Sequence, residues 1–193
     1  IDLIERDPGA FQVEALTANR NVDLLADQAR RLNARLAVVA DESKYDDLKK
    51  ALAGTQVQVA AGREALIEAA AAPSDWVMAA IVGAAGIRPV MDAIEAGSTL
   101  ALANKESLVS AGVIMTRAAK DRNVAILPVD SEHNAIFQCL DPTRPERVER
   151  IVLTASGGPF RTWNREAMRA VTPERAVQHP NWSMGAKISI DSA

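Results

Sequence analysis

Residues 99–129 read TLALANKESLVSAGVIMTRAAKDRNVAILPV, and this stretch decides the fold. It opens with an apolar run at 99–103, continues with apolar residues at helical spacing over 107–122, and closes with a second apolar run at 124–129. A strand, a helix of more than ten residues and another strand form a crossover unit, which joins parallel strands. The stretch therefore predicts a parallel sheet.

The same alternation runs through the chain before this stretch. The hydrophobic period predicts strands at 11–18, 35–40, 56–60 and 76–82, and helices at 22–32, 45–53, 63–71 and 87–96. Residues 1–6 have the pattern of the last turns of a helix. We expect a doubly wound, mostly parallel α/β domain of Rossmann type over residues 1–129.

The pattern changes after residue 129. Three prolines divide the chain into short pieces, and apolar or alternating residues at 150–153 and 187–191 predict two further strands. We expect part of an α+β domain over residues 130–193.

Composition excludes several classes of protein. The formal charge of −3 argues against a nucleic-acid partner, which calls for a basic face, and 48% hydrophobic residues argue against disorder. The longest nearly uncharged apolar stretch, 76–87, is shorter than the roughly 20 residues of a membrane helix. With a single cysteine, Cys139, and no signal peptide in the sequence as given, we expect a cytoplasmic protein with no membrane partner.

Ligands of open parallel sheets bind beyond the carboxyl ends of the strands. The predicted strand 11–18 is followed by Asn19, Arg20 and Asn21. An arginine there, with no acid nearby in sequence, favours the 2′-phosphate of NADP, while a solvated polar turn is an equal alternative. After strand 99–103 come Asn104, Lys105 and Glu106, which could contact a cofactor or substrate or simply begin a helix.

Asp130, Ser131 and Glu132 follow the strand 124–129. Two carboxylates two residues apart at a strand end can bind one Mg²⁺ or Mn²⁺, and such an ion could polarise a carbonyl. The alternative is that Asp130 or Ser131 caps the next helix.

Two later loops are further candidates. Residues 154–160 (TASGGPF) are small enough to let backbone amides approach an anion, or they are an ordinary turn. Residues 179–185 (HPNWSMG) could close over a substrate, or form a surface loop with Trp182 packed on the core.

Taken together, residues 103–109 (ANKESLV), 128–135 (PVDSEHNA), 156–160 (SGGPF), 179–185 (HPNWSMG) and 187–189 (KIS) resemble one family. The chain is similar to 1-deoxy-D-xylulose 5-phosphate reductoisomerases along its whole length. The resemblance implies a homodimeric, NADPH-dependent enzyme of the non-mevalonate isoprenoid pathway. Its small-molecule substrate is a sugar phosphate, which is rearranged and then reduced to 2-C-methyl-D-erythritol 4-phosphate.

The resemblance also assigns roles to residues. Asp130 and Glu132 would hold Mn²⁺ or Mg²⁺, with Co²⁺ a further candidate, and Lys105 and His179 would act with them in catalysis. Residues implied to contact substrate are Lys105, Ser131, Glu132, Ser156, His179, Trp182 and Ser192, with Met184 in the lid. Residues implied to contact NADPH are Asn19, Arg20, Asn21, Asn104, Glu106 and Gly185.

Two segments of the family do not occur in these 193 residues: the glycine-rich loop GSTGSIG, expected before residue 1, and MNKGLE, expected after residue 193. We therefore expect this chain to be a piece of the enzyme and inactive by itself. Two other functions stay open from sequence: another NADP-dependent sugar-phosphate or semialdehyde reductase, and a module that senses NADP without turnover.

Overall fold

The computed structural model describes residues 1–155, 157–183 and 185–191. The chain divides into two compact units, Ile1–Asp130 and Ser131–Ala193. The division lies one residue beyond the expected boundary after 129. Each unit is described by itself.

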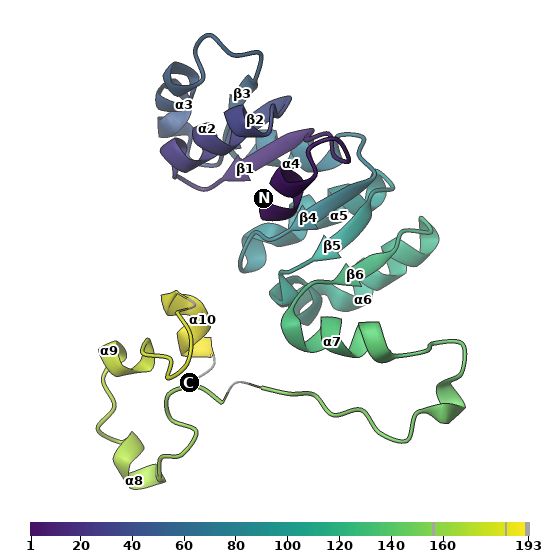
Figure 1. Cartoon of the computed structure of the whole chain (residues 1–193), viewed down its shortest axis with the longest axis vertical. Helices are drawn as coiled ribbons and strands as arrows, with labels where there is room; N and C mark the ends of the chain where they lie inside the picture. The colour runs from purple at the N-terminus through teal and green to yellow at the C-terminus, as the bar shows by residue number, and fades with distance from the viewer. Residues whose placement is uncertain (156, 184, 192–193) are drawn as a thin grey trace. The chain divides into compact units, whose positions relative to one another are not determined.

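The first unit alternates strands and helices along its length (Figure 1). Its strands are β1 (Ala15–Ala18), β2 (Leu36–Val39), β3 (Gln58–Ala61), β4 (Trp76–Ala79), β5 (Thr99–Leu102) and β6 (Ile126–Pro128). Its α-helices are α1 (Asp2–Arg6), α2 (Val22–Arg31), α3 (Tyr45–Ala51), α4 (Arg63–Ala71), α5 (Ile87–Glu95) and α6 (Lys105–Asp121), with 3₁₀ turns η1 (Glu42–Lys44) and η2 (Ala84–Gly86). The α/β class predicted from the hydrophobic period is confirmed.

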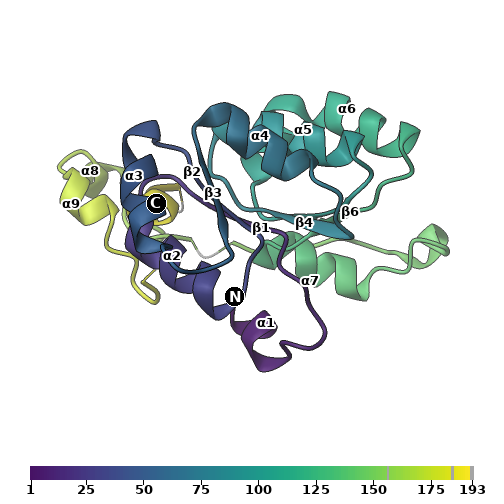
Figure 2. The same cartoon turned by 90° about the horizontal axis from the view of Figure 1, so that it is seen from above.

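The strands form two parallel ladders of three, β1-β2-β3 and β4-β5-β6. In the first, Leu36 lies between Ala15 and Gln58. Helices cover both faces, with α2 and α3 on one side of the strands and α4, α5 and α6 on the other (Figure 2). This is the two-sided covering of a doubly wound fold.

Each ladder has its own core. Strand β2 is buried at its last three positions, and its side chains join Leu25, Ala29 and Leu48 of the flanking helices. In the second core, Leu100 and Leu102 of β5 pack with Ile94 of α5 and Met115 of α6. The central strands β2 and β5 are continuous apolar runs because both of their faces are buried, whereas Trp76 and Met78 of β4 are exposed.

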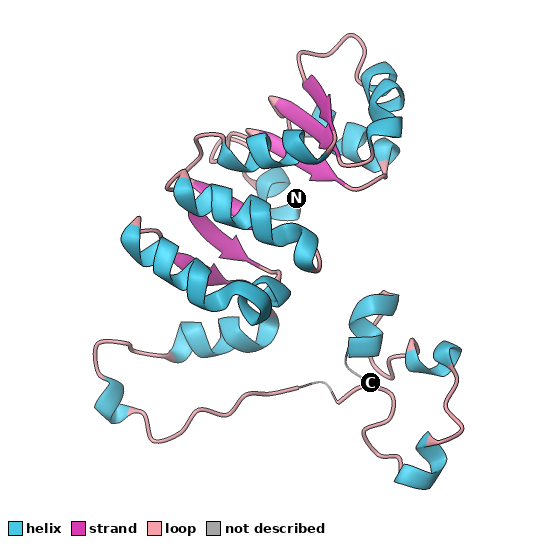
Figure 3. Cartoon of the chain, turned by 180° about the vertical axis from the view of Figure 1, so that it is seen from behind, coloured by secondary structure: helices cyan, strands magenta, loops and turns pink. Residues whose placement is uncertain are grey.

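The described residues of the second unit contain helices and no strand (Figure 3). The helices are α7 (Ser131–Cys139), the 3₁₀ turn η3 (Pro145–Arg147), α8 (Arg165–Met168), α9 (Pro173–Ala176) and α10 (Ala186–Asp191).

The two strands expected in this unit are therefore wrong. Residues 150–153 pair with no other described strand, and their apolar side chains are exposed. Residues 187–191 lie in α10, because the Gly185 carbonyl accepts hydrogen bonds from Ser189 N (3.1 Å) and Oγ (2.9 Å) and so closes a helical turn.

No helix among the described residues is long and apolar enough to cross a bilayer.

Candidate functional site

The loop after β1 lies beside the loop after β2. Backbone pairing continues past both strands, with Ala40 N donating to Ala18 O at 2.8 Å and Asp41 N donating to Asn19 O at 3.0 Å. This pairing places Asp41 beside the predicted cofactor loop, residues 19–21, at the carboxyl edge of the ladder.

Arg20 has an acidic partner in space. Its Nε lies 2.9 Å from Oδ2 of Asp41, whereas sequence reasoning found no acid near it. That expectation is corrected: the acid stands 21 positions later, and parallel pairing brings it back. An aspartate directly after the predicted strand 35–40 was the signal that could have found it.

Asp41 is held in place by Ser43. Its Oδ1 accepts hydrogen bonds from Ser43 N (3.0 Å) and Oγ (2.6 Å). These bonds, more than the nearby charges of Arg20 and Lys44, lower the pKa of the Asp41 carboxyl below its usual value. The carboxyl is therefore ionised at neutral pH.

A polar cavity of about 610 Å³ opens beside Arg20. Its charged lining residues are four cations, Arg20, Arg30, Lys44 and Lys50, and two acids, Asp23 and Asp47. Lys44 pairs with Asp47 at 2.9 Å, and the cations outnumber the acids. Asn21 also lines it and caps α2, accepting a hydrogen bond from Leu24 N at 3.1 Å. Basic side chains at the positive end of a helix suit an anionic ligand.

Asn104 joins the loop after β4 to the start of α6. Its Oδ1 accepts from Ser107 N at 3.3 Å, and its Nδ2 donates to the carbonyl oxygens of Ile81 and Gly83. The side chain is almost completely buried, at 3% exposure. Residues 104–106 therefore begin a helix, which was one of the two alternatives for them. Lys105 is exposed and Glu106 is half-buried in the first turn of that helix.

The predicted strand 76–82 is too long, because β4 ends at Ala79 and residues 80–86 form a loop that Asn104 holds. No role is predicted from the sequence for this loop. At Gly86 an added Cβ would lie 2.4 Å from Asn104 Nδ2 and 2.6 Å from Ile81 O, so the loop needs a glycine there. A glycine directly before a helix, following another at 83, was the available signal.

The two predicted metal ligands, Asp130 and Glu132, lie between the end of β6 and the first turn of α7. Asp130 ends the first unit, Ser131 is the exposed first residue of α7, and Glu132 is half-buried in its first turn. Within the described residues no group of three His, Cys, Asp or Glu side chains could hold a metal ion. That Asp130 and Glu132 provide two ligands for a divalent cation therefore stays a prediction.

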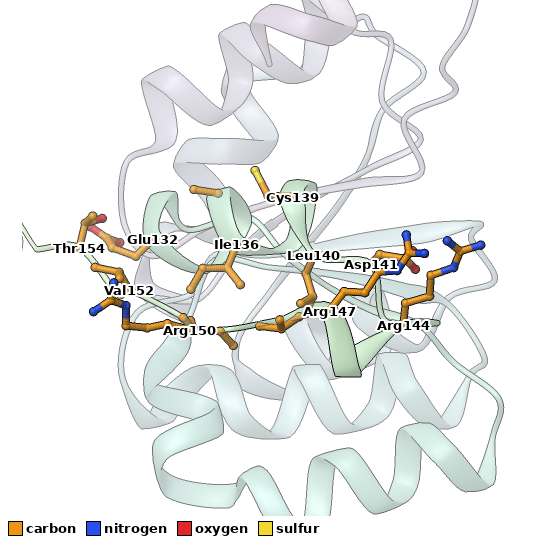
Figure 4. Close-up of a pocket in the computed structure, with 13 residues that line it drawn as sticks. Glu132, Ile136, Cys139, Leu140, Asp141, Arg144, Arg147, Arg150, Val152 and Thr154 are labelled. Atoms are coloured by element: carbon orange, nitrogen blue, oxygen red, sulfur yellow. The ribbon is translucent and has the colours of Figure 1, made fainter.

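Glu132 lines a cavity of about 410 Å³ in the second unit (Figure 4). One wall is α7, with Ile136 and Cys139, and the other is the extended segment that carries Val152 and Thr154. The predicted strand 150–153 thus forms one wall of this cavity.

His179 is fixed by its own loop. Its Nδ1 accepts hydrogen bonds from Asn181 N (3.2 Å) and Trp182 N (3.1 Å), and its ring stacks on Trp182 with centroids 5.1 Å apart. The neutral ring therefore carries its proton on Nε2. Nε2 is buried and has no partner among the described residues, which leaves a donor for a bound anion.

The remaining predicted residues are only partly described. Gly185 takes a left-handed φ of +77° directly before α10. Ser156, Met184 and Ser192 lie outside the described residues.

The comparisons with known proteins decide the family. The family model for 1-deoxy-D-xylulose 5-phosphate reductoisomerase matches residues 1–112, and the model for its C-terminal domain matches residues 126–193. The chain belongs to the 1-deoxy-D-xylulose 5-phosphate reductoisomerase family. The resemblance read from its motifs is therefore confirmed.

The sequences of individual reductoisomerases match this chain over its whole length. The protein of Zymomonas mobilis is 62% identical over 193 residues, and that of Rhodospirillum centenum 58%. The match covers all of this chain and 50% and 48% of those two relatives, so the chain spans about half their length.

Two solved reductoisomerase structures are similar. The Zymomonas mobilis enzyme in complex with NADPH has a TM-score of 0.91 at 59% identity, with 100% of this chain and 49% of that one covered. A reductoisomerase complex with NADPH, fosmidomycin and magnesium has a TM-score of 0.89 at 40% identity, covering 98% and 49%.

Proposed function

We propose that this chain supplies much of the cofactor-binding part and the first metal ligands of a 1-deoxy-D-xylulose 5-phosphate reductoisomerase. The reaction would be the NADPH- and divalent-metal-dependent isomerisation and reduction to 2-C-methyl-D-erythritol 4-phosphate. The observation that carries the proposal is that both family models match in order, one over the first ladder's loops and one over residues that include Glu132 and His179.

The first unit fits NADPH. Arg20 presents a guanidinium to a cavity lined by further cations, as a 2′-phosphate requires. Asn104 and Glu106 stand where β5 ends and α6 begins, a second place at which a cofactor can meet this edge. When bound, NADPH supplies the hydride, and the residues of this chain orient it.

The carboxylates fit a small oxygen-preferring cation. Asp130 and Glu132 would hold Mg²⁺, Mn²⁺ or Co²⁺, and the described residues provide no softer His or Cys cluster in their place. When bound, the ion supplies Lewis-acid polarisation of the substrate oxygens. Ser131 and Lys105 would bind the substrate beside it.

His179 would donate its Nε2 proton in a hydrogen bond to the phosphate end of the substrate. Its ring is already held by two backbone amides and by Trp182, so little ordering is left for substrate binding. Trp182, 57% exposed, would close over the substrate and exclude water. Ser156, Ser192 and Gly185 complete the proposed set of contacts, together with Asn19 and Asn21.

We further propose that the enzyme is a cytoplasmic homodimer, with a sugar phosphate as its partner and neither nucleic acid nor membrane bound. The family resemblance supports the dimer, and the single cysteine supports a reducing compartment.

The test is NADPH consumption by the protein at its full natural length, with 1-deoxy-D-xylulose 5-phosphate and Mn²⁺. Asp130→Asn should lower the rate by about 100-fold or more while leaving NADPH affinity unchanged, because one metal ligand is lost. Asp121→Asn, which neutralises an exposed carboxylate at the end of α6, is the control and should retain the wild-type rate. A wild-type rate in Asp130→Asn would show that the carboxylate has no metal role.

A further inference from the structure

The Arg20–Asp41 ion pair lies at the position predicted to bind the 2′-phosphate. The proposed function assigns a role to Arg20 and none to Asp41. Asp41 is fixed from two sides. Its backbone amide donates to Asn19 O, and its Oδ1 accepts two hydrogen bonds from Ser43. Only Oδ2 faces Arg20.

The contact orients Arg20 without using up its donors. The ion pair is made through Nε, which lies 2.9 Å from Asp41 Oδ2, and a guanidinium has two further nitrogens that can donate. The arginine side chain is 69% exposed, so without an anchor it would sample many rotamers. The anchored guanidinium keeps its N–H groups for an anion in the adjoining cavity.

A second ion pair on the same two strands shows the contrast. Arg35 and Glu14 lie where β1 and β2 begin, and their side chains are 68% and 27% exposed, against 69% and 24% for Arg20 and Asp41. There Arg35 Nη1 donates a hydrogen bond to Glu14 Oε2 at 2.8 Å. That pair does not line the cavity beside Arg20 and serves as a built-in control.

We infer that Asp41 is a positioning residue for cofactor choice: it holds the Arg20 guanidinium in place for the 2′-phosphate that distinguishes NADPH from NADH. This inference rests on the proposed function. Asp41 acts through Arg20, because it pairs with the arginine and does not itself line the cavity.

The test compares NADPH and NADH affinities of the full-length protein by quenching of intrinsic fluorescence. Asp41→Asn keeps an oxygen to accept from Ser43 N but loses the charge that anchors Arg20. We expect NADPH affinity to fall about fivefold, the upper end of the range for an exposed ion pair. NADH affinity should stay the same, because NADH lacks the 2′-phosphate, and Asp41→Glu should restore part of the loss. Glu14→Gln should change neither affinity.

A double-mutant cycle separates positioning from a structural effect. In an Arg20→Ala background, Asp41→Asn should have no further effect on NADPH affinity, because the residue that Asp41 positions is gone. The inference is overturned if Asp41→Asn weakens NADPH and NADH equally, if it strengthens NADPH binding, or if its effect persists without Arg20. A wild-type protein that binds no NADPH would instead defeat the proposed function.

Discussion

At the residue scale, two asparagines cap helices at the candidate site, and one of them, Asn104, also holds a neighbouring loop. Asn21 and Asn104 both accept a hydrogen bond from the backbone of the first helical turn. Asn21 makes no other side-chain hydrogen bond within the described part of the chain, whereas Asn104 also donates to two carbonyl oxygens of the loop 80–86. Because Asn104 is buried, water cannot replace those bonds when the side chain is changed.

Asn104→Asp should therefore destabilise the protein more than Asn21→Ala. The aspartate can still cap α6, but it cannot donate to Ile81 and Gly83, and it places a carboxylate among carbonyl oxygens. We expect a loss of about 2–3 kcal/mol in the free energy of unfolding, against about 1 kcal/mol for Asn21→Ala. Urea denaturation of both variants measures the difference, and equal losses would show that the loop bonds contribute nothing.

At the element scale, short segments take their conformation from their neighbours. The run 150–153 has the composition of a strand, but a strand needs a paired neighbour and none is present among the described residues. The alternating run 187–191 lies in α10, since a stretch of five residues fits either period and the turn at Gly185 favours the helix. The extent of α6 is close to the predicted 107–122 because its period continues over many turns, but Ala111, with φ −136° and ψ 18°, kinks the helix.

Two glycines on helical segments should respond in opposite ways to alanine. At Gly86 the added Cβ would meet Asn104 and Ile81, while at Gly112, inside α6, its nearest neighbour is Leu108 at 3.9 Å. We expect Gly86→Ala to lower the free energy of unfolding by about 2 kcal/mol through overpacking. Gly112→Ala should raise it by about 0.5–1 kcal/mol through helix propensity. Thermal unfolding tests both, and a stabilised Gly86→Ala would mean that the loop has room to move.

At the scale of the whole molecule, the first unit consists of two ladders instead of one continuous sheet. In each ladder the strands follow one another in chain order, and a helical segment joins each strand to the next. Parallel pairing therefore gathers the loops that follow the strands of a ladder at its carboxyl edge.

The two units should differ in their resistance to protease. Residues 140–155 are exposed throughout and contain only the turn η3, whereas the strands and helices before 130 surround two cores. In the 193-residue chain, trypsin should cut first after Arg147 or Arg150, since Pro145 protects the bond after Arg144. Mass spectrometry of a brief digest should show a persistent fragment that includes the first unit. Earlier cuts before residue 130 would contradict this expectation.

The sequence by itself determined the alternation of strands and helices up to residue 129 and the loops that carry the family's motifs. Both are local, because a hydrophobic period and a motif are carried by neighbouring residues. Only the tertiary structure decided that Asp41 meets Arg20, that Asn104 holds the loop 80–86, and that 150–153 stays unpaired in the described chain. Each of these depends on residues some twenty or more positions apart in sequence, or on the presence of a pairing partner, which only the folded backbone brings together.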